Sequence, residues 1–136
     1  EEIYIQKSLK NLSELNQLVT KRIAELLCAK TQFVNSKELE TLGIKDDKLI
    51  EICKLLNAKS YLSGPAAKDY INPDKFKSEN IGLEYIIYDY PKYSQLYGTF
   101  NHFVSVLDVL FNCGRESAQY IFQSKKEIVF SSTIKT

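Results

Sequence analysis

The chain has 136 residues, of which 44% are hydrophobic and 26% charged, and these values are typical of one globular domain with a substantial core. Eighteen basic and 17 acidic residues leave a net charge of +1, and the lysines are spread along the chain. We therefore expect no nucleic acid as a partner and no attraction to an acidic membrane surface. No apolar stretch approaches the roughly 20 residues of a membrane-spanning helix, so no membrane insertion is expected.

The two ends and the cysteines bear on where the protein works. The chain opens with Glu1-Glu2 and contains no Met, which predicts that Glu1 is not the natural start and that the chain is a fragment, a processed product or an engineered piece. No signal peptide is visible. Cys28, Cys53 and Cys113 are an odd set at wide spacings. Such a set favours reduced thiols in a cytoplasmic protein over a disulfide framework.

Helices and short strands are predicted to alternate through the first part of the chain. A helix over 12–26 is indicated by apolar residues at three- and four-residue steps, with Asn11 and Glu14 in a capping arrangement. Residues 31–34 have the composition of a strand. A second helix begins at Asp46-Asp47, and its core face is predicted from the spacing of Leu49, Ile52, Cys53 and Leu56.

The second part of the chain continues the pattern. A strand is expected at 60–62, and Asn72-Pro73 marks the start of a short third helix. The β-branched and aromatic run 81–88 predicts a strand that is buried on both faces. After an irregular stretch, helices are expected over 104–112, ended by Gly114, and over 115–122.

This order of elements predicts an α/β fold with three α/β/α layers and a mainly parallel sheet, in which the strands near 31–34, 60–62 and 81–88 are adjacent. Residues 1–124 are expected to form a single domain. The tail 125–136 is polar except for Ile128-Val129-Phe130. It is either an added strand or a loose end, and the sequence does not decide between them.

The loop after the second predicted strand is the first place where chemistry is expected. It reads Ser63-Gly64-Pro65-Ala66-Ala67-Lys68-Asp69-Tyr70. Small residues at the carboxyl end of a parallel strand let the backbone approach a ligand, so Ser63 and Gly64 are predicted to contact one. Lys68 would meet a phosphate or carboxylate, and Asp69 would orient Lys68 or act as a base. The alternative is a tight turn with exposed Lys and Asp; the Gly-Lys-Ser/Thr ending of a P-loop is absent.

Five tyrosines between residues 85 and 97 form the second stretch of interest. Tyr85 and Tyr88 fall inside a predicted strand, where core packing explains them. Tyr90, Tyr93 and Gln95 follow in a loop and are better ligand candidates, because aromatic rings beside polar groups suit stacking against a sugar or a base.

The third stretch runs from Phe100 to Gly114. Ser105 and Asp108 lie on one face of the first turn of a predicted helix, where they either cradle an anionic group or act as an N-cap and a first-turn acid. His102, the only histidine, precedes this helix and could form a Cys–His pair with Cys113, although a lone loop histidine is usually incidental. No cluster has metal-ligand spacing, so no metal is expected. The pattern identifies neither a catalytic residue nor a cofactor.

Taken in this order, these stretches resemble the WbqC-like protein family. The motifs that carry the resemblance are Lys48–Lys54, Leu62–Tyr70, Tyr93-Ser94-Gln95-Leu96, Phe100 and Ser105–Gly114, and the likeness runs from about Leu12 to Ala118. The chain corresponds to the later portion of the family, because the usual opening His-Gln-Pro segment is absent. Tyr90 stands where many relatives have His, which weakens any role that needs a histidine in that loop.

The resemblance implies a cytoplasmic bacterial protein in the synthesis of surface polysaccharide of the O-antigen type. It implies an enzyme, of transferase type, acting on an activated sugar or a sugar-modifying group, with an anionic sugar or a sugar nucleotide as ligand. Whether the protein is an enzyme is not decided by the residues. A non-catalytic binding or assembly module of the same system is the alternative. The enzyme needs a pocket where the 63–70 loop, the 90–97 loop and the Ser105 helix start converge, whereas the module needs a flat apolar patch.

Overall fold

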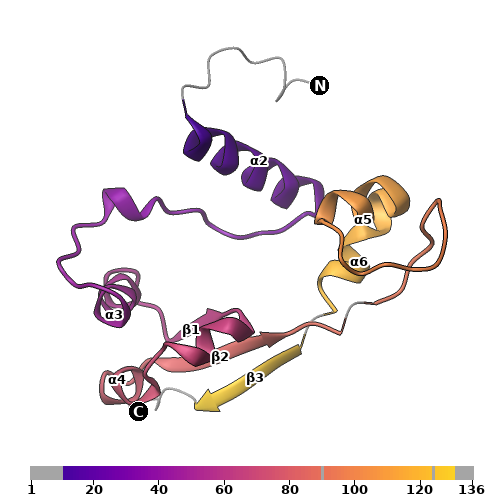
Figure 1. Ribbon diagram of the computed structural model, residues 1–136. Helices are drawn as coiled ribbons and strands as arrows, with labels where there is room; N and C mark the ends of the chain where they lie inside the picture. The colour runs from indigo at the N-terminus through magenta and orange to yellow at the C-terminus, as the bar shows by residue number, and fades with distance from the viewer. Residues whose placement is uncertain (1–10, 90, 124, 131–136) are drawn as a thin grey trace. The chain divides into compact units, whose positions relative to one another are not determined.

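The structure is a computed structural model that describes residues 11–89, 91–123 and 125–130. Its elements in chain order are α2 (Leu12–Leu26), η1 (Ser36–Glu38), α3 (Asp46–Leu55), β1 (Ser60–Ser63), η2 (Pro65–Asp69), α4 (Pro73–Ser78), β2 (Gly82–Ile87), α5 (Val106–Cys113), η3 (Gly114–Glu116), α6 (Ser117–Ile121) and β3 (Lys125–Phe130) (Figure 1). Helices and strands in this proportion confirm the α/β class. None of the helices in the described ranges is long and apolar enough to cross a membrane.

The chain divides into two compact units. Unit 1 comprises the described residues of Glu1–Phe33 and Tyr90–Phe122, and unit 2 comprises those of Val34–Asp89 and Gln123–Thr136. Unit 1 therefore contains α2, α5 and α6, whereas unit 2 contains α3, α4 and the sheet. The expectation of a single domain over 1–124 stays a prediction.

Local signals place the helix starts where the sequence predicted them. Asn11 caps α2, because its side chain accepts a hydrogen bond from the backbone N–H of Glu14 at 3.0 Å and donates one to the Glu14 carboxylate at 2.8 Å. Asn72 caps α4 in the same way, through the N–H of Asp74 at 3.0 Å, and Pro73 occupies the first turn. Gly114 ends α5 with a positive φ of 52°.

The sheet has three strands in the order β1-β2-β3 (Figure 1). β1 and β2 are parallel, with Ser60 opposite Gly82, as the sequence predicted. β3 pairs with β2 in the antiparallel direction, so the sheet is mixed and not mainly parallel. Residues 31–34 are not a strand, which corrects the prediction made from their composition. A β-rich composition favours a strand only where a neighbouring strand completes the hydrogen-bond ladder. The three-layer arrangement stays a prediction.

β3 decides the open question about the tail as far as residue 130: Lys125–Phe130 is an added strand, not a loose end. Residues 131–136 lie outside the described part of the chain.

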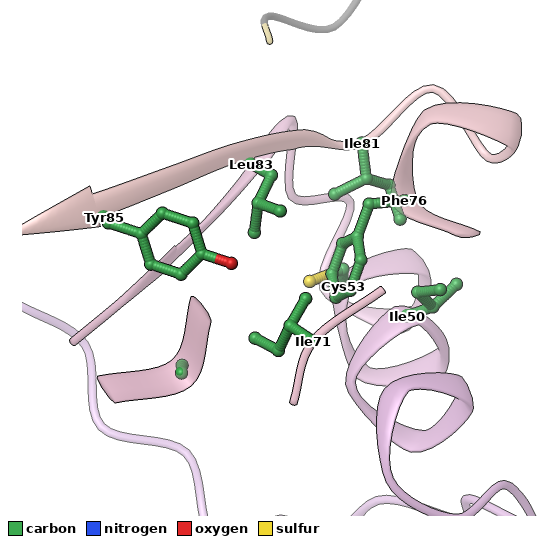
Figure 2. Packing of buried hydrophobic residues seen from close by; sticks show 8 residues of the cluster. Ile50, Cys53, Ile71, Phe76, Ile81, Leu83 and Tyr85 are labelled. Atoms are coloured by element: carbon green, nitrogen blue, oxygen red, sulfur yellow. The ribbon is translucent and has the colours of Figure 1, made fainter. Parts of the chain in front are cut away.

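The core of unit 2 lies between α3, α4 and the sheet. Figure 2 shows the side chains of Ile50, Cys53, Ile71, Phe76, Ile81, Leu83 and Tyr85 converging there. Phe76 and Leu83 are fully buried, and the ring of Tyr61 stacks on that of Phe76 with centroids 5.4 Å apart. Central strand β2 supplies Leu83 and Tyr85, which fits the predicted burial of that run.

The core face of α3 differs from the predicted one. Asp46, Ile50 and Cys53 are the buried positions, whereas Ile52 is half-buried and Leu56 is 46% exposed. The prediction was right for Cys53 and wrong for Leu56. The buried stripe includes Asp46 because its carboxylate accepts a hydrogen bond from the backbone N–H of Asn72 at 3.2 Å, which satisfies a polar group that burial would otherwise penalise.

Candidate functional site

The candidate site is an open hollow in unit 1 with a volume of about 820 Å³. Its lining comes from the loop 95–104 and from one side of α5, which contributes Asp108, Phe111 and Asn112. The end of the second stretch and much of the third therefore line one hollow.

A hydrogen-bond network centred on Asp108 joins two lining residues, Asp108 and Gln95, to Tyr93, which does not itself line the hollow. Asp108 Oδ2 accepts two hydrogen bonds, from the Tyr93 hydroxyl at 2.7 Å and from Gln95 Nε2 at 2.9 Å. Two donors on one oxygen hold the carboxylate in a fixed orientation. Asp108 Oδ1 accepts no hydrogen bond from any residue in the described ranges.

The local fold explains why these side chains meet. The side chain of Gln95 makes two hydrogen bonds with the backbone of Asn101. Its Nε2 donates to the Asn101 carbonyl at 2.9 Å, and its Oε1 accepts from the Asn101 N–H at 2.8 Å. The loop between them is thereby closed. Ser105 caps α5 through the N–H of Leu107 at 3.2 Å, which sets Asp108 in the first turn of the helix. Asn112 lies one turn later, where its Nδ2 donates to the Asp108 carbonyl at 2.8 Å.

Tyr93 is packed as well as hydrogen-bonded. Its ring meets those of Phe100 and Tyr120 edge to face, at centroid distances of 5.3 and 5.6 Å. Burial, followed by the hydrogen bond to Asp108, raises the pKa of the Tyr93 hydroxyl above its ordinary value. The phenol is therefore protonated at neutral pH and donates to Asp108, which excludes it as a base.

Cys113 is a poor nucleophile in this setting. Burial, with smaller contributions from the carboxylates of Glu116 and Asp108, raises the pKa of its thiol. Catalytic cysteines need a lowered pKa, because the thiolate is the reactive form. This disfavours the Cys113–His102 pair. His102 lines the hollow, and the centroid of its ring is 3.9 Å from the centroid of the Phe103 ring.

The apolar part of the lining is unusually open to solvent. Tyr97, Phe103 and Phe111 all line the hollow and are 87%, 85% and 85% exposed, respectively. Exposed aromatic side chains gathered in one place mark a surface that contacts a ligand or a partner.

The loop 63–70 belongs to unit 2. β1 ends at Ser63, and the turn then runs from Gly64 into the short helix η2, in which Ala67 is buried and Lys68 and Asp69 are exposed. Gly64 has ordinary extended backbone, and a Cβ atom placed on it would meet nothing within 4 Å. No feature of the fold itself therefore requires glycine at this position.

Lys68 pairs with a carboxylate that the sequence did not suggest. Its Nζ is 2.5 Å from Glu127 Oε2 on β3 and 5.4 Å from the centre of the Tyr85 ring. Asp69, expected as the orienting acid, is not the partner. Both members of the Lys68–Glu127 pair keep more than two-fifths of their side-chain surface exposed, so the pair stabilises the fold by at most about 1 kcal/mol.

The model of the WbqC-like protein family matches residues 1–120. The chain belongs to this family. The uncharacterised protein Rv1507c of Mycobacterium tuberculosis is 36% identical over 120 residues, which cover 88% of this chain and 52% of that protein. This WbqC-like chain thus spans about half the length of that curated relative. No solved structure was found to match it significantly.

Family membership confirms the resemblance seen in the sequence. The structure shows which of the candidate residues lie together and which do not. Tyr93, Gln95 and Asp108 are brought together at the hollow. Ser105 caps α5, and its contact with a ligand stays a prediction. Ser63, Gly64, Lys68 and Asp69 lie in unit 2, and their contact with a ligand stays a prediction. Tyr90 lies outside the described residues.

Sequence reasoning missed several lining residues of this WbqC-like protein, among them Asn101, Phe103, Phe111 and Asn112. Phe111 and Asn112 belong to the quoted motif that ends at Gly114, and an aromatic residue beside an amide was the available signal. Among the residues that the structure describes, no group of three or more His, Cys, Asp and Glu side chains could hold a metal ion.

Proposed function

We propose that this WbqC-like protein takes part in the synthesis of bacterial surface polysaccharide of the O-antigen type, as a transferase-type enzyme that acts on an activated sugar or a sugar-modifying group. Family membership and a hollow that combines a carboxylate, amides and aromatic rings support this proposal. We place the protein in the cytoplasm, because its three cysteines suit a reducing compartment.

The observation that carries the proposal is the hydrogen bonding of the two carboxylate oxygens of Asp108. Its Oδ2 is held by Tyr93 and Gln95, whereas Oδ1 accepts no hydrogen bond from the described residues that surround it. A transfer to a sugar hydroxyl needs a base. In the proposed step the hydroxyl oxygen attacks the electrophilic carbon of the donor, its proton passes to Asp108, and the leaving group departs with the bonding electron pair. Preorganised donors on Oδ2 keep the base oriented during this transfer.

The 63–70 loop is proposed as a separate binding site for an anionic group such as a phosphate. Lys68 supplies the positive charge, and Ser63 supplies a hydroxyl at the end of β1. Because the exposed Lys68–Glu127 pair is weak, a phosphate group can compete with Glu127 for the ammonium. The open space above Gly64 leaves room for a ligand to approach the backbone.

A non-catalytic assembly module is the second candidate, favoured by the exposed apolar side chains beside the hollow. Leu96 is 80% exposed, and Tyr97, Phe103 and Phe111 are still more exposed. A partner protein could cover this surface. The two candidates differ in which residue matters: the enzyme depends on the charge of Asp108, and the module depends on the apolar side chains.

The experiment that tests the proposal is deletion of the gene followed by complementation, read as the length distribution of the surface polysaccharide. We expect deletion to change that distribution and the wild-type gene to restore it. Asp108→Asn should fail to restore it, whereas Glu116→Gln, a matched removal of an exposed carboxylate outside the hollow, should succeed. An unchanged polysaccharide after deletion would refute the proposed role.

A variant that replaces the apolar side chains separates the two candidates. Restoration by Asp108→Asn together with failure of Leu96→Ser would replace the enzyme with the assembly module. The abundance of each variant in the cell must match that of the wild type, because loss of stability alone lowers function.

A further inference from the structure

We infer that the hollow beside Asp108 holds the uncharged, hydroxyl-bearing part of the ligand and not its anionic part. This inference rests on the proposed function and adds the class of ligand. The charge of the lining, the direction of its hydrogen bonds and its aromatic rings support it.

The charge of the lining opposes an anion. The thirteen residues that line the hollow include no Lys or Arg, and the only carboxylate among them is that of Asp108. A phosphate or carboxylate placed here would meet the like charge of Asp108, and His102 is the only basic side chain in the lining. Anion sites in proteins are commonly built from Arg or Lys, and neither lines this hollow.

The direction of the hydrogen bonds selects hydroxyl groups. The side-chain amide of Gln95 bonds to the backbone of Asn101 and to Asp108, and Asn101 Oδ1 accepts a hydrogen bond from the N–H of Phe103 at 2.9 Å. Asp108 Oδ1 and Asn112 Oδ1 accept no hydrogen bond from the part of the chain that the structure describes. These two oxygens are acceptors, and acceptors need O–H or N–H donors.

Aromatic rings complete the match to a sugar. Tyr97, Phe103 and Phe111 offer flat apolar faces to the hollow. One side of a pyranose ring carries C–H groups that pack on such faces, while its hydroxyls point to the edges, where Asp108 and Asn112 lie on one helix. An ammonium group would also suit a carboxylate beside aromatic rings. The test therefore includes a cationic probe.

The test maps backbone amide shifts by NMR in the full-length protein, titrated with a panel of neutral methyl hexopyranosides at millimolar concentration. Glucose 1-phosphate and glucosamine serve as the anionic and cationic probes. We expect at least one neutral glycoside to shift amides within residues 95–112. Glucose 1-phosphate should shift these amides less than the neutral glycoside does. The difference should be largest at low ionic strength, where repulsion by Asp108 is least screened.

Variants tie the shifts to the named groups. Asp108→Asn keeps the shape of the side chain and should weaken binding of the neutral glycoside about tenfold or more, the expected effect of losing one charge-assisted hydrogen bond. Glu116→Gln should have no effect. Phe111→Ala should also weaken binding, and Phe122→Ala, which removes another exposed ring that does not line the hollow, should not.

Three outcomes would overturn the inference: tighter or equal binding of glucose 1-phosphate at residues 95–112, binding of glucosamine alone, or no response of these amides to any neutral glycoside. If glucose 1-phosphate shifts only amides of the 63–70 loop and no probe shifts the amides of residues 95–112, the inference fails and the proposed function survives. If no sugar probe shifts any amide, both fail.

Discussion

Replacing Tyr93 by Phe isolates the hydrogen bond that orients Asp108. The substitution removes only the hydroxyl, which donates to Asp108 Oδ2 at 2.7 Å, and keeps the ring contacts with Phe100 and Tyr120. A hydrogen bond to a charged acceptor is worth about 1.5–3 kcal/mol, and Gln95 continues to donate to the same oxygen. We therefore expect a loss in the free energy of unfolding of about 1–2 kcal/mol.

Urea denaturation at neutral pH measures this loss, and the wild type measured at higher pH checks its origin. The folded-state pKa of Tyr93 is raised, so its contribution to stability is complete below the ordinary phenol pKa of about 10 and is lost as the pH rises through the folded-state value. The stability difference between wild type and Tyr93→Phe should therefore shrink above about pH 10. A substitution that leaves stability unchanged at pH 7 would refute the assigned hydrogen bond, and a pH-independent difference would refute its dependence on the phenol proton.

Four further substitutions test other parts of the structure. Gly43→Ala should destabilise unit 2 by about 1–3 kcal/mol in thermal denaturation, because its Cβ would lie 2.8 Å from the backbone of α3; unchanged stability would contradict that approach. Ile50→Ala, at a 6% exposed position, should cost about 2–4 kcal/mol, whereas Leu56→Ala should cost less than about 1 kcal/mol; equal losses would show that the buried face of α3 is misassigned. Lys68→Ala should leave the melting temperature nearly unchanged, since its pair with Glu127 is exposed, but should weaken binding of glucose 1-phosphate; unaltered affinity would leave the loop as a turn only.

The parts of the fold that depend on local signals were predictable. Asn11 and Asn72 mark helix starts because a side-chain oxygen caps N–H groups within a few residues, and such a signal is complete in the sequence. The parallel pairing of β1 with β2 followed from a helix lying between two strands.

The parts that depend on distant partners were not predictable. Residues 31–34 have the composition of a strand but are not one, because composition does not supply a ladder partner. The core face of α3 was displaced because Asp46 is buried, and its burial depends on the N–H of Asn72. β3 could not be decided from a tail whose partner strand lies about 40 residues earlier in the chain.

The candidate site shows the same division. Tyr93, Gln95 and Asp108 were picked out by residue type, but their meeting at one carboxylate oxygen depends on a loop that Gln95 closes on Asn101. Lys68 was also predicted from its residue type, but its partner was not. Glu127 lies 59 residues away, in a segment that the sequence did not identify as a strand.

The most direct test of the central claim is a crystal structure of the full-length protein bound to the neutral glycoside that binds best. The account predicts a sugar hydroxyl within hydrogen-bonding distance of Asp108 Oδ1, roughly 2.5–3.0 Å, and the C–H face of the ring on Phe111. A sugar bound elsewhere with the hollow empty, or a hollow filled by another segment of the protein, would contradict it.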